Sequence, residues 1–204
     1  MKNSGSFGVC GLCGVRKGKA AMTAHLKQCL PSAANGSPRI PVMLLRVKAA
    51  YAPMYWMYVA AGCDAKLGQL DDLLRGVWLE CCDHMSEFCT TARQEISMSR
   101  RLREVFYRQG IGMKHVYDFG TSTELMVYCA GLAEGTSVKP VVAARNEPPV
   151  WPCDICGETA SSVCVECYEG GFCCIQHAED HDCGEEMLLP VVNSPRMGVC
   201  GYTG

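Results

Sequence analysis

Cysteines spaced as Cys-x-x-Cys pairs, with histidines close behind them, are the feature that most restricts how this chain can fold. Sixteen of its 204 residues are cysteine, near the level at which a covalent or metal framework is expected. The first residues lack the apolar stretch of a signal peptide, and no segment has the ~20 apolar residues that span a bilayer. We therefore expect a cytoplasmic, reducing environment, in which clustered cysteines bind metal rather than form disulfides.

The first cysteine-rich segment has the spacing of a zinc finger. Cys10 and Cys13 form one pair, and His25 and Cys29 follow at the four-residue spacing that places two side chains on one helix face. Four such ligands fill a tetrahedral zinc site and leave no open position for catalysis. The segment resembles a C2H2-type finger whose last ligand is cysteine. We expect a zinc finger over residues 1–30; two unrelated cysteine pairs with a chance histidine are the alternative.

A second cysteine-rich segment, residues 150–187, predicts two more zinc ions. Nine cysteines and histidines follow one another there, one more than two tetrahedral sites need. An interleaved cross-brace would tie together a segment too short to build a core. Its two sites would take Cys153, Cys156, Cys174 and His177, and Cys164, Cys167, His181 and Cys183. The sequence leaves open whether Cys173 or Cys174 is the ligand.

The spacing of this second segment resembles the B-box and HIT-finger zinc domains. A single zinc ion with loose cysteines is one alternative, and a redox Cys-x-x-Cys pair is another. With the finger, we expect about three zinc ions per chain.

The middle of the chain, residues 40–146, predicts a mixed α+β domain. A linker over residues 31–39 precedes it, and an extended tail over residues 188–204 ends the chain. Strand patterns cover residues 42–50, 55–61, 114–119, 124–130 and 138–144, and helical patterns cover residues 67–78 and 97–107. The predicted fold class is therefore α+β, a central mixed domain flanked by two small zinc-binding modules.

Charge differs strongly between the two ends of the chain. Residues 1–41 carry six basic and no acidic side chains, whereas residues 150–204 carry nine acidic and one basic. The basic finger favours phosphate contacts. One finger reads only about three base pairs, so non-specific nucleic-acid contact and docking on protein both remain open. The acidic module is expected to contact protein. The predicted nucleic-acid-binding residues are Arg16, Lys17, Lys19 and Lys27.

The middle segment also carries motifs of a known family. They are Trp56, the helix from Leu67-x-x-Leu70 to Trp78, His84-Met-Ser-Glu87-Phe88 and Tyr117-Asp118-Phe119-Gly120. On these motifs the segment resembles the open-reading-frame-three-like family first named from an Ri plasmid, also known as a passenger protein of an insertion element. The resemblance implies an α+β fold and a link to mobile elements, without an established biochemical role. Residues 121–123 depart from the family's Asp-Ser-Trp, and both zinc modules are additions.

An enzyme is the alternative from a different functional class. His84, Glu87 and Asp118 could form acid–base machinery, with His115 as a further candidate; a cysteine nucleophile at 81–82 beside His84 is another option. The alternative is a structural role, in which His84 packs at a helix end and Asp118 binds backbone amides in a turn. No P-loop, GxGxxG, GxSxG or HExxH motif is present. We therefore expect a zinc-binding adaptor, with a small enzyme acting on nucleic acid as the alternative.

Overall fold

The computed structural model describes residues 6–167 and 170–204. The first five residues, which the search for a signal peptide included, lie outside the described residues. The chain forms two compact units. Unit 1 comprises Met1–Leu74 and Met85–Glu147, and unit 2 comprises Arg75–His84 and Pro148–Gly204. Unit 1 thus combines the segments predicted as finger, linker and central domain.

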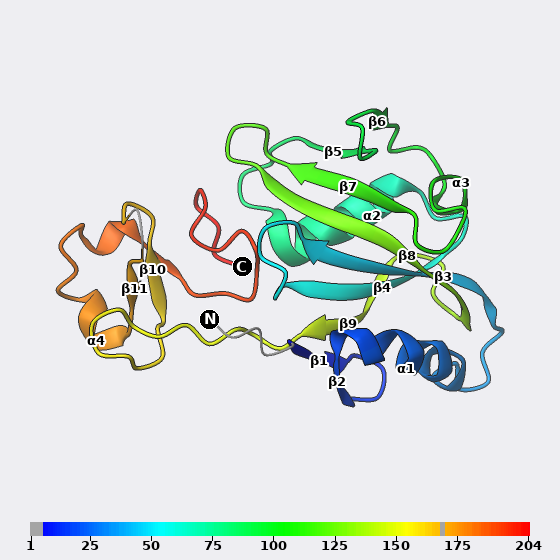
Figure 1. Ribbon diagram of the computed structural model, residues 1–204, viewed down its shortest axis with the longest axis horizontal. Coiled ribbons are helices and arrows are strands. Elements are labelled where there is room, and N and C mark those ends of the chain that lie inside the picture. The colour runs from blue at the N-terminus through cyan, green and yellow to red at the C-terminus, as the bar shows by residue number, and fades with distance from the viewer. Residues whose placement is uncertain (1–5, 168–169) are drawn as a thin grey trace. The chain divides into compact units, whose positions relative to one another are not determined.

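A nine-stranded antiparallel sheet forms the frame of unit 1 (Figure 1). Its order is β2-β1-β9-β4-β3-β8-β7-β5-β6. The strands are β1 (Phe7–Cys10), β2 (Arg16–Gly18), β3 (Ile40–Ala49), β4 (Trp56–Gly62), β5 (Ser86–Cys89), β6 (Glu95–Ile96), β7 (Gly112–Tyr117), β8 (Thr123–Gly135) and β9 (Val141–Asn146). The predicted strands in residues 40–146 correspond to β3, β4, β7, β8 and β9.

The N-terminal finger is built into this sheet, because β1 pairs with β9 as well as with β2. Gly8 marks the close approach: a Cβ there would lie 2.4 Å from the carbonyl oxygen of Arg145 and 2.6 Å from the ring of Trp56. Only glycine fits at this position without a shift of its neighbours. Strands β1 and β2 therefore form one edge of the sheet.

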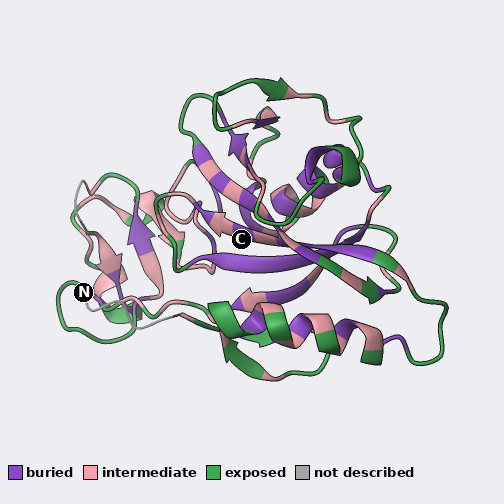
Figure 2. Ribbon diagram, turned by 45° about the vertical axis from the view of Figure 1, so that its right-hand side comes forward, coloured by how far each residue is buried: buried purple, intermediate pink, exposed green. Residues whose placement is uncertain are grey.

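Helix α1 (Lys19–Ser32) covers part of the sheet with an apolar stripe. Met22, Leu26 and Leu30 recur at four-residue spacing, are buried, and belong to one core cluster with Val42 and Leu44 of β3. The same cluster includes the large side chains of β4, Trp56 and Tyr58. Buried residues accordingly concentrate along the central strands and the inner face of α1 (Figure 2).

The two predicted helices in the middle segment have different outcomes. The pattern over residues 67–78 corresponds to α2 (Leu67–Leu74), followed by the π-helical turn η1 (Arg75–Leu79). The basic helix predicted over 97–107 is wrong in extent, because only α3 (Leu102–Val105) is helical. The carbonyls of Met98 and Arg100 instead accept hydrogen bonds from the backbone N–H groups of Gly68 and Leu67. They satisfy donors that the first turn of α2 leaves unpaired.

Unit 2 consists of short elements with a sparse apolar core. Its sheet has the order β11-β10-β12, formed by β10 (Ser162–Cys164), β11 (Phe172–Cys173) and β12 (Leu188–Pro190). Helix α4 (Ile175–Ala178) and the 3-10 turn η2 (Glu185–Met187) complete it, with η1. The tail predicted as extended contributes β12, and its side chains Ser194, Arg196 and Tyr202 are buried.

None of the helices in the described part of the chain combines the length and the apolar character that a membrane span needs.

Candidate metal centres

The first candidate centre lies where β1 ends and α1 packs against the sheet. Cys10 is the last residue of β1, Cys13 follows in a turn, and His25 and Cys29 lie on α1. The Sγ of Cys10 lies 3.9 Å from that of Cys29, and the Sγ of Cys13 lies 3.3 Å from Nε2 of His25. The turn is fixed by the N–H of Gly14, which donates to the carbonyl of Cys10. The structure thus gathers the four ligands predicted for the finger.

These separations can be compared with those of a zinc site. Zinc–sulfur bonds of about 2.3 Å and zinc–nitrogen bonds of about 2.0–2.1 Å at tetrahedral angles place two sulfurs about 3.8 Å apart, and sulfur and nitrogen about 3.6 Å apart. The observed pairs lie within a few tenths of an ångström of these values. Three thiolates and one imidazole are also a donor set that suits zinc.

The C-terminal cysteines form two groups, and they interleave along the chain. The first contains Cys153, Cys156, Cys174 and His177. The Sγ of Cys156 lies 3.8 Å from that of Cys174, and Nδ1 of His177 lies 3.6 Å from the Sγ of Cys153 and 3.2 Å from that of Cys174. The Cys-x-x-Cys pair sits before β10, and the other two ligands come from the start of α4.

The second C-terminal group contains Cys164, Cys167, His181 and Cys183. The Sγ of Cys167 lies 3.6 Å from Nε2 of His181 and 3.9 Å from the Sγ of Cys183. Cys173 is buried and lies outside this group. Its Sγ lies 3.6 Å from Nδ1 of His181. The structure therefore places Cys174 in the first C-terminal group and Cys173 outside both groups, next to His181.

Hydrogen bonds and burial lower the pKa of some thiols in these groups and raise the pKa of others. The backbone N–H of Cys156 lowers the pKa of Cys153 to about 6. Burial opposes ionisation of Cys164, yet the N–H of Glu166 and the ring of His181 lower its pKa to about 7. The hydrogen bond with Cys164 raises the pKa of Cys167 to about 12. A divalent cation would stabilise all of these thiolates together, so metal binding releases protons.

A fourth Cys/His group was missed by the sequence analysis. It contains Cys81, Cys82, His84 and Cys200, whose ligand atoms lie within 4.8 Å of one another. The sequence considered the first three only as a nucleophile with its base. The Cys-Cys-x-His run at residues 81–84 is the one local sequence signal of this group. Cys200, its fourth residue, is more than 100 residues away and belongs to no Cys-x-x-Cys pair. The described residues therefore contain four groups that can hold metal ions, where about three zinc ions were predicted.

The four predicted nucleic-acid-binding residues are in different surroundings. Arg16 is paired: its guanidinium donates to both carboxylate oxygens of Glu147, at 2.6 and 2.8 Å. Lys17 is exposed on β2. Lys19 and Lys27 lie on α1.

The predicted acid–base residues make contacts typical of structural roles. Oδ1 of Asp118 accepts hydrogen bonds from the N–H groups of Gly120 and Thr121, at 2.9 and 3.2 Å, in the turn between β7 and β8. Nε2 of His84 lies 3.2 Å from the Sγ of Cys82. The enzyme hypothesis stays a prediction.

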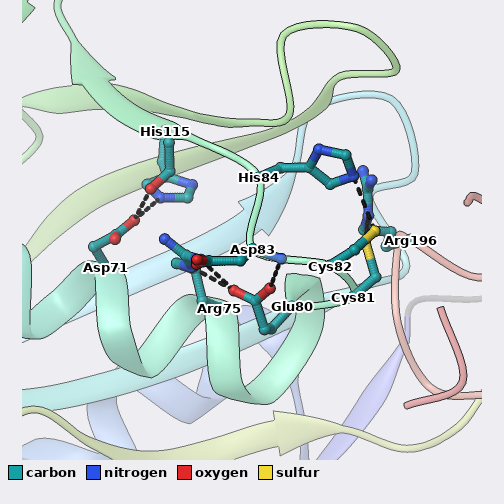
Figure 3. Close-up of polar contacts among 10 residues, drawn as sticks. Asp71, Arg75, Glu80, Cys81, Cys82, Asp83, His84, His115 and Arg196 are labelled. Atoms are coloured by element: carbon teal, nitrogen blue, oxygen red, sulfur yellow. Dashed lines mark hydrogen bonds and ion pairs between the residues drawn. The ribbon is translucent and has the colours of Figure 1, made fainter. Parts of the chain in front are cut away.

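His115 is engaged in the interior of unit 1. Its Nε2 lies 2.6 Å from Oδ1 of Asp71, which also accepts a hydrogen bond from Ser86 (Figure 3). The histidine is fully buried and its carboxylate partner nearly so. This pair therefore braces α2 against β7.

No family model and no curated protein matches the chain. A similar solved structure is a protein of unknown function from Methanosarcina mazei Go1, with a TM-score of 0.44 and 15% sequence identity, covering 52% of this chain and 68% of that chain. The resemblance to the Ri-plasmid family stays a prediction.

Proposed function

We propose that the chain is a zinc-organised adaptor that binds nucleic acid or a nucleoprotein through a cationic surface of unit 1 and binds protein through its acidic unit 2. One observation carries the proposal: cations that form no ion pair with a carboxylate of the described residues gather beside α1 on an open part of the sheet.

The cationic surface begins on β3. Side chains of a strand alternate between two faces, so Val42, Leu44, Arg46 and Lys48 share one face. The first two lie in the core cluster with α1. The two cations continue this face beyond the cluster and are partly exposed. Tyr128 of β8 pairs with Arg46 in register, and its ring centroid lies 5.4 Å from the guanidinium and 5.6 Å from Nζ of Lys48.

Lys19 brings a third positive charge to this surface. Burial lowers the pKa of Lys19, and the charges of Lys48 and Arg46 lower it further. Its Nζ donates to the carbonyl of Pro53. Within the described residues, none of the three cations forms an ion pair with a carboxylate. Phosphate groups would supply the missing negative charge.

Two adjoining hollows extend the surface. One, of about 320 Å³, is lined by Arg46 and Tyr128, and the other, of about 640 Å³, by Lys27, Tyr107 and Arg108. Both are also lined by Gln109 and Cys129. Tyr107 is 67% exposed. Aromatic rings set in a cationic groove are the arrangement with which proteins bind single-stranded nucleic acid.

Unit 2 supports the second half of the proposal through exposed apolar side chains among its acids. Ile155 is 66% and Ile175 is 73% exposed. Each is the sequence neighbour of a ligand, Cys156 or Cys174, and the two sulfurs lie 3.8 Å apart. A metal ion there would fix the loops that present both isoleucines. Apolar contacts surrounded by acidic side chains suit a basic protein partner.

The test is the affinity for a fluorescein-labelled single-stranded oligouridine, measured by anisotropy at several salt concentrations. The double variant R46Q/K48Q removes two charges from the surface. The matched control K66Q/K139Q removes two charges from exposed lysines outside it.

The proposal predicts at least tenfold weaker binding for R46Q/K48Q and a salt slope reduced by roughly 1.4, which is about 0.7 per lost phosphate contact. The control should match the wild type. Equal affinities and slopes for both double variants would refute the proposed surface.

A further inference from the structure

Two distant segments of unit 2 bring four ligands to one point. The Sγ of Cys82 lies 3.2 Å from Nε2 of His84 and 3.3 Å from the Sγ of Cys200, whose own distance to that nitrogen is 3.7 Å. The Sγ of Cys81 lies 3.4 Å from that of Cys82. These sulfurs are too far apart for disulfides, whose bond length is about 2.05 Å, and close enough to share one ion.

The loop that carries three of these ligands has a conformation that suits ligation. Asp83, between Cys82 and His84, has φ +58, a left-handed conformation that non-glycine residues seldom adopt. Glu80 holds it there by accepting a hydrogen bond from its N–H at 2.6 Å, and Arg75 binds its carboxylate at 2.8 Å. The turn brings the side chains on both sides of Asp83 to the same point.

The fourth ligand is held in a similar way, because Cys200 also has a left-handed backbone, with φ +55. Backbone strain of this kind persists where the surroundings fix it, and often at ligand sites.

The charge around the group provides an independent argument. Arg196 is fully buried, and its Nε donates to the Sγ of Cys81 at 3.4 Å (Figure 3). A buried cation is unfavourable unless negative charge lies beside it. Three thiolates around Zn²⁺ carry a net charge of about −1, which Arg196 would balance.

The residues that precede Cys200 contact the same loop segment. The hydroxyl of Ser194 donates to the carbonyl of Trp78 at 2.6 Å and accepts from the N–H of Arg196 at 2.9 Å. The tail is thereby led towards the three ligands of residues 81–84.

We infer that Cys81, Cys82, His84 and Cys200 form a fourth zinc site, which fastens the C-terminal tail, residues 188–204, to residues 75–84. The site goes beyond the proposed function, because it contains no residue of the cationic surface. Cys82 and Cys200 lie 118 residues apart in the sequence, so the ion acts as a cross-link between distant parts of the chain.

The experiment is native mass spectrometry of the full chain, purified with zinc under reducing conditions. The variants are C200S and C82S, which remove ligands from the two segments separately. The matched control is C63S, because Cys63 is half-buried and lies outside all four groups. Hydrogen exchange of residues 191–204 is followed in parallel.

The inference predicts four zinc ions in the wild type and in C63S, three in C200S and in C82S, and faster exchange of the tail in both ligand variants. Three ions in the wild type would overturn it. So would four ions in either ligand variant. A wild-type mass lower by two hydrogens with three zinc ions would indicate a disulfide and overturn it as well. Oligouridine affinity is a separate readout, so failure of the surface and failure of this site are distinguishable.

Discussion

The N-terminal and C-terminal Cys/His groups have similar ligands but lie in different surroundings. The N-terminal group lies at the edge of a nine-stranded sheet, next to an apolar cluster that includes Met22, Leu26, Leu44 and Trp56. The two groups between residues 153 and 183 lie among strands of two or three residues, and the cysteines themselves are most of what is buried there. A bound metal would therefore supplement an apolar core in the N-terminal region and would replace one in the C-terminal region.

Among the predicted effects, metal removal should produce the largest difference between the N-terminal and C-terminal regions. A small module held by zinc is typically unfolded without it. On chelation, we expect residues 153–183 to lose nearly all protection from hydrogen exchange, while β3, β4 and β8 keep theirs. Exchange followed by mass spectrometry measures both regions in one sample, and readdition of zinc should restore the protection. Simultaneous loss in both regions would show that the sheet also depends on metal.

A substitution in the apolar core should instead destabilise unit 1 and leave the zinc content unchanged. Leu44 is fully buried between the sheet and α1, so L44A should lower the free energy of unfolding of unit 1 by about 2–5 kcal/mol. Zinc content should not change, because the substitution removes no ligand. Urea unfolding measures the first quantity and elemental analysis the second. I175A, at a side chain that is 73% exposed, is the control and should stay within about 0.5 kcal/mol. Loss of zinc from L44A would contradict the separation.

The smallest effect is expected at the ion pair between β2 and the end of β9. Arg16 binds Glu147 and stacks on Phe7 at 3.9 Å, but both charged side chains are substantially exposed. An exposed pair contributes about 0–1 kcal/mol, so R16A should lower the free energy of unfolding by no more than this. R39A, which breaks a longer exposed pair of 3.7 Å, provides the baseline in the same urea titration. A larger loss would mean that this ion pair, rather than strand pairing, holds the finger to the sheet.

Local patterns made most of the architecture predictable. Alternation and helical spacing located β3, β4, α2 and the β7–β8 hairpin within a few residues. The grouping of the C-terminal cysteines and histidines was predictable because each Cys-x-x-Cys pair is a local signal. The same holds for the finger, where His25 and Cys29 are one helical turn apart.

The features that the sequence did not predict depend on contacts between residues far apart in the chain. The pairing of β1 with β9 joins positions more than 130 residues apart, and nothing in the four residues of β1 indicates it. The helix predicted over residues 97–107 is mostly absent because Met98 and Arg100 bond to the backbone of α2. Cys200 has no neighbouring ligand in sequence, so its group became visible only in three dimensions.

Zinc K-edge X-ray absorption tests the central claim most directly, because all four groups contain three cysteines and one histidine. The account predicts an average shell of three sulfurs at about 2.3 Å and one nitrogen at about 2.0–2.1 Å for every bound zinc ion. A shell dominated by nitrogen and oxygen, or a reduced protein that binds no zinc, would contradict it.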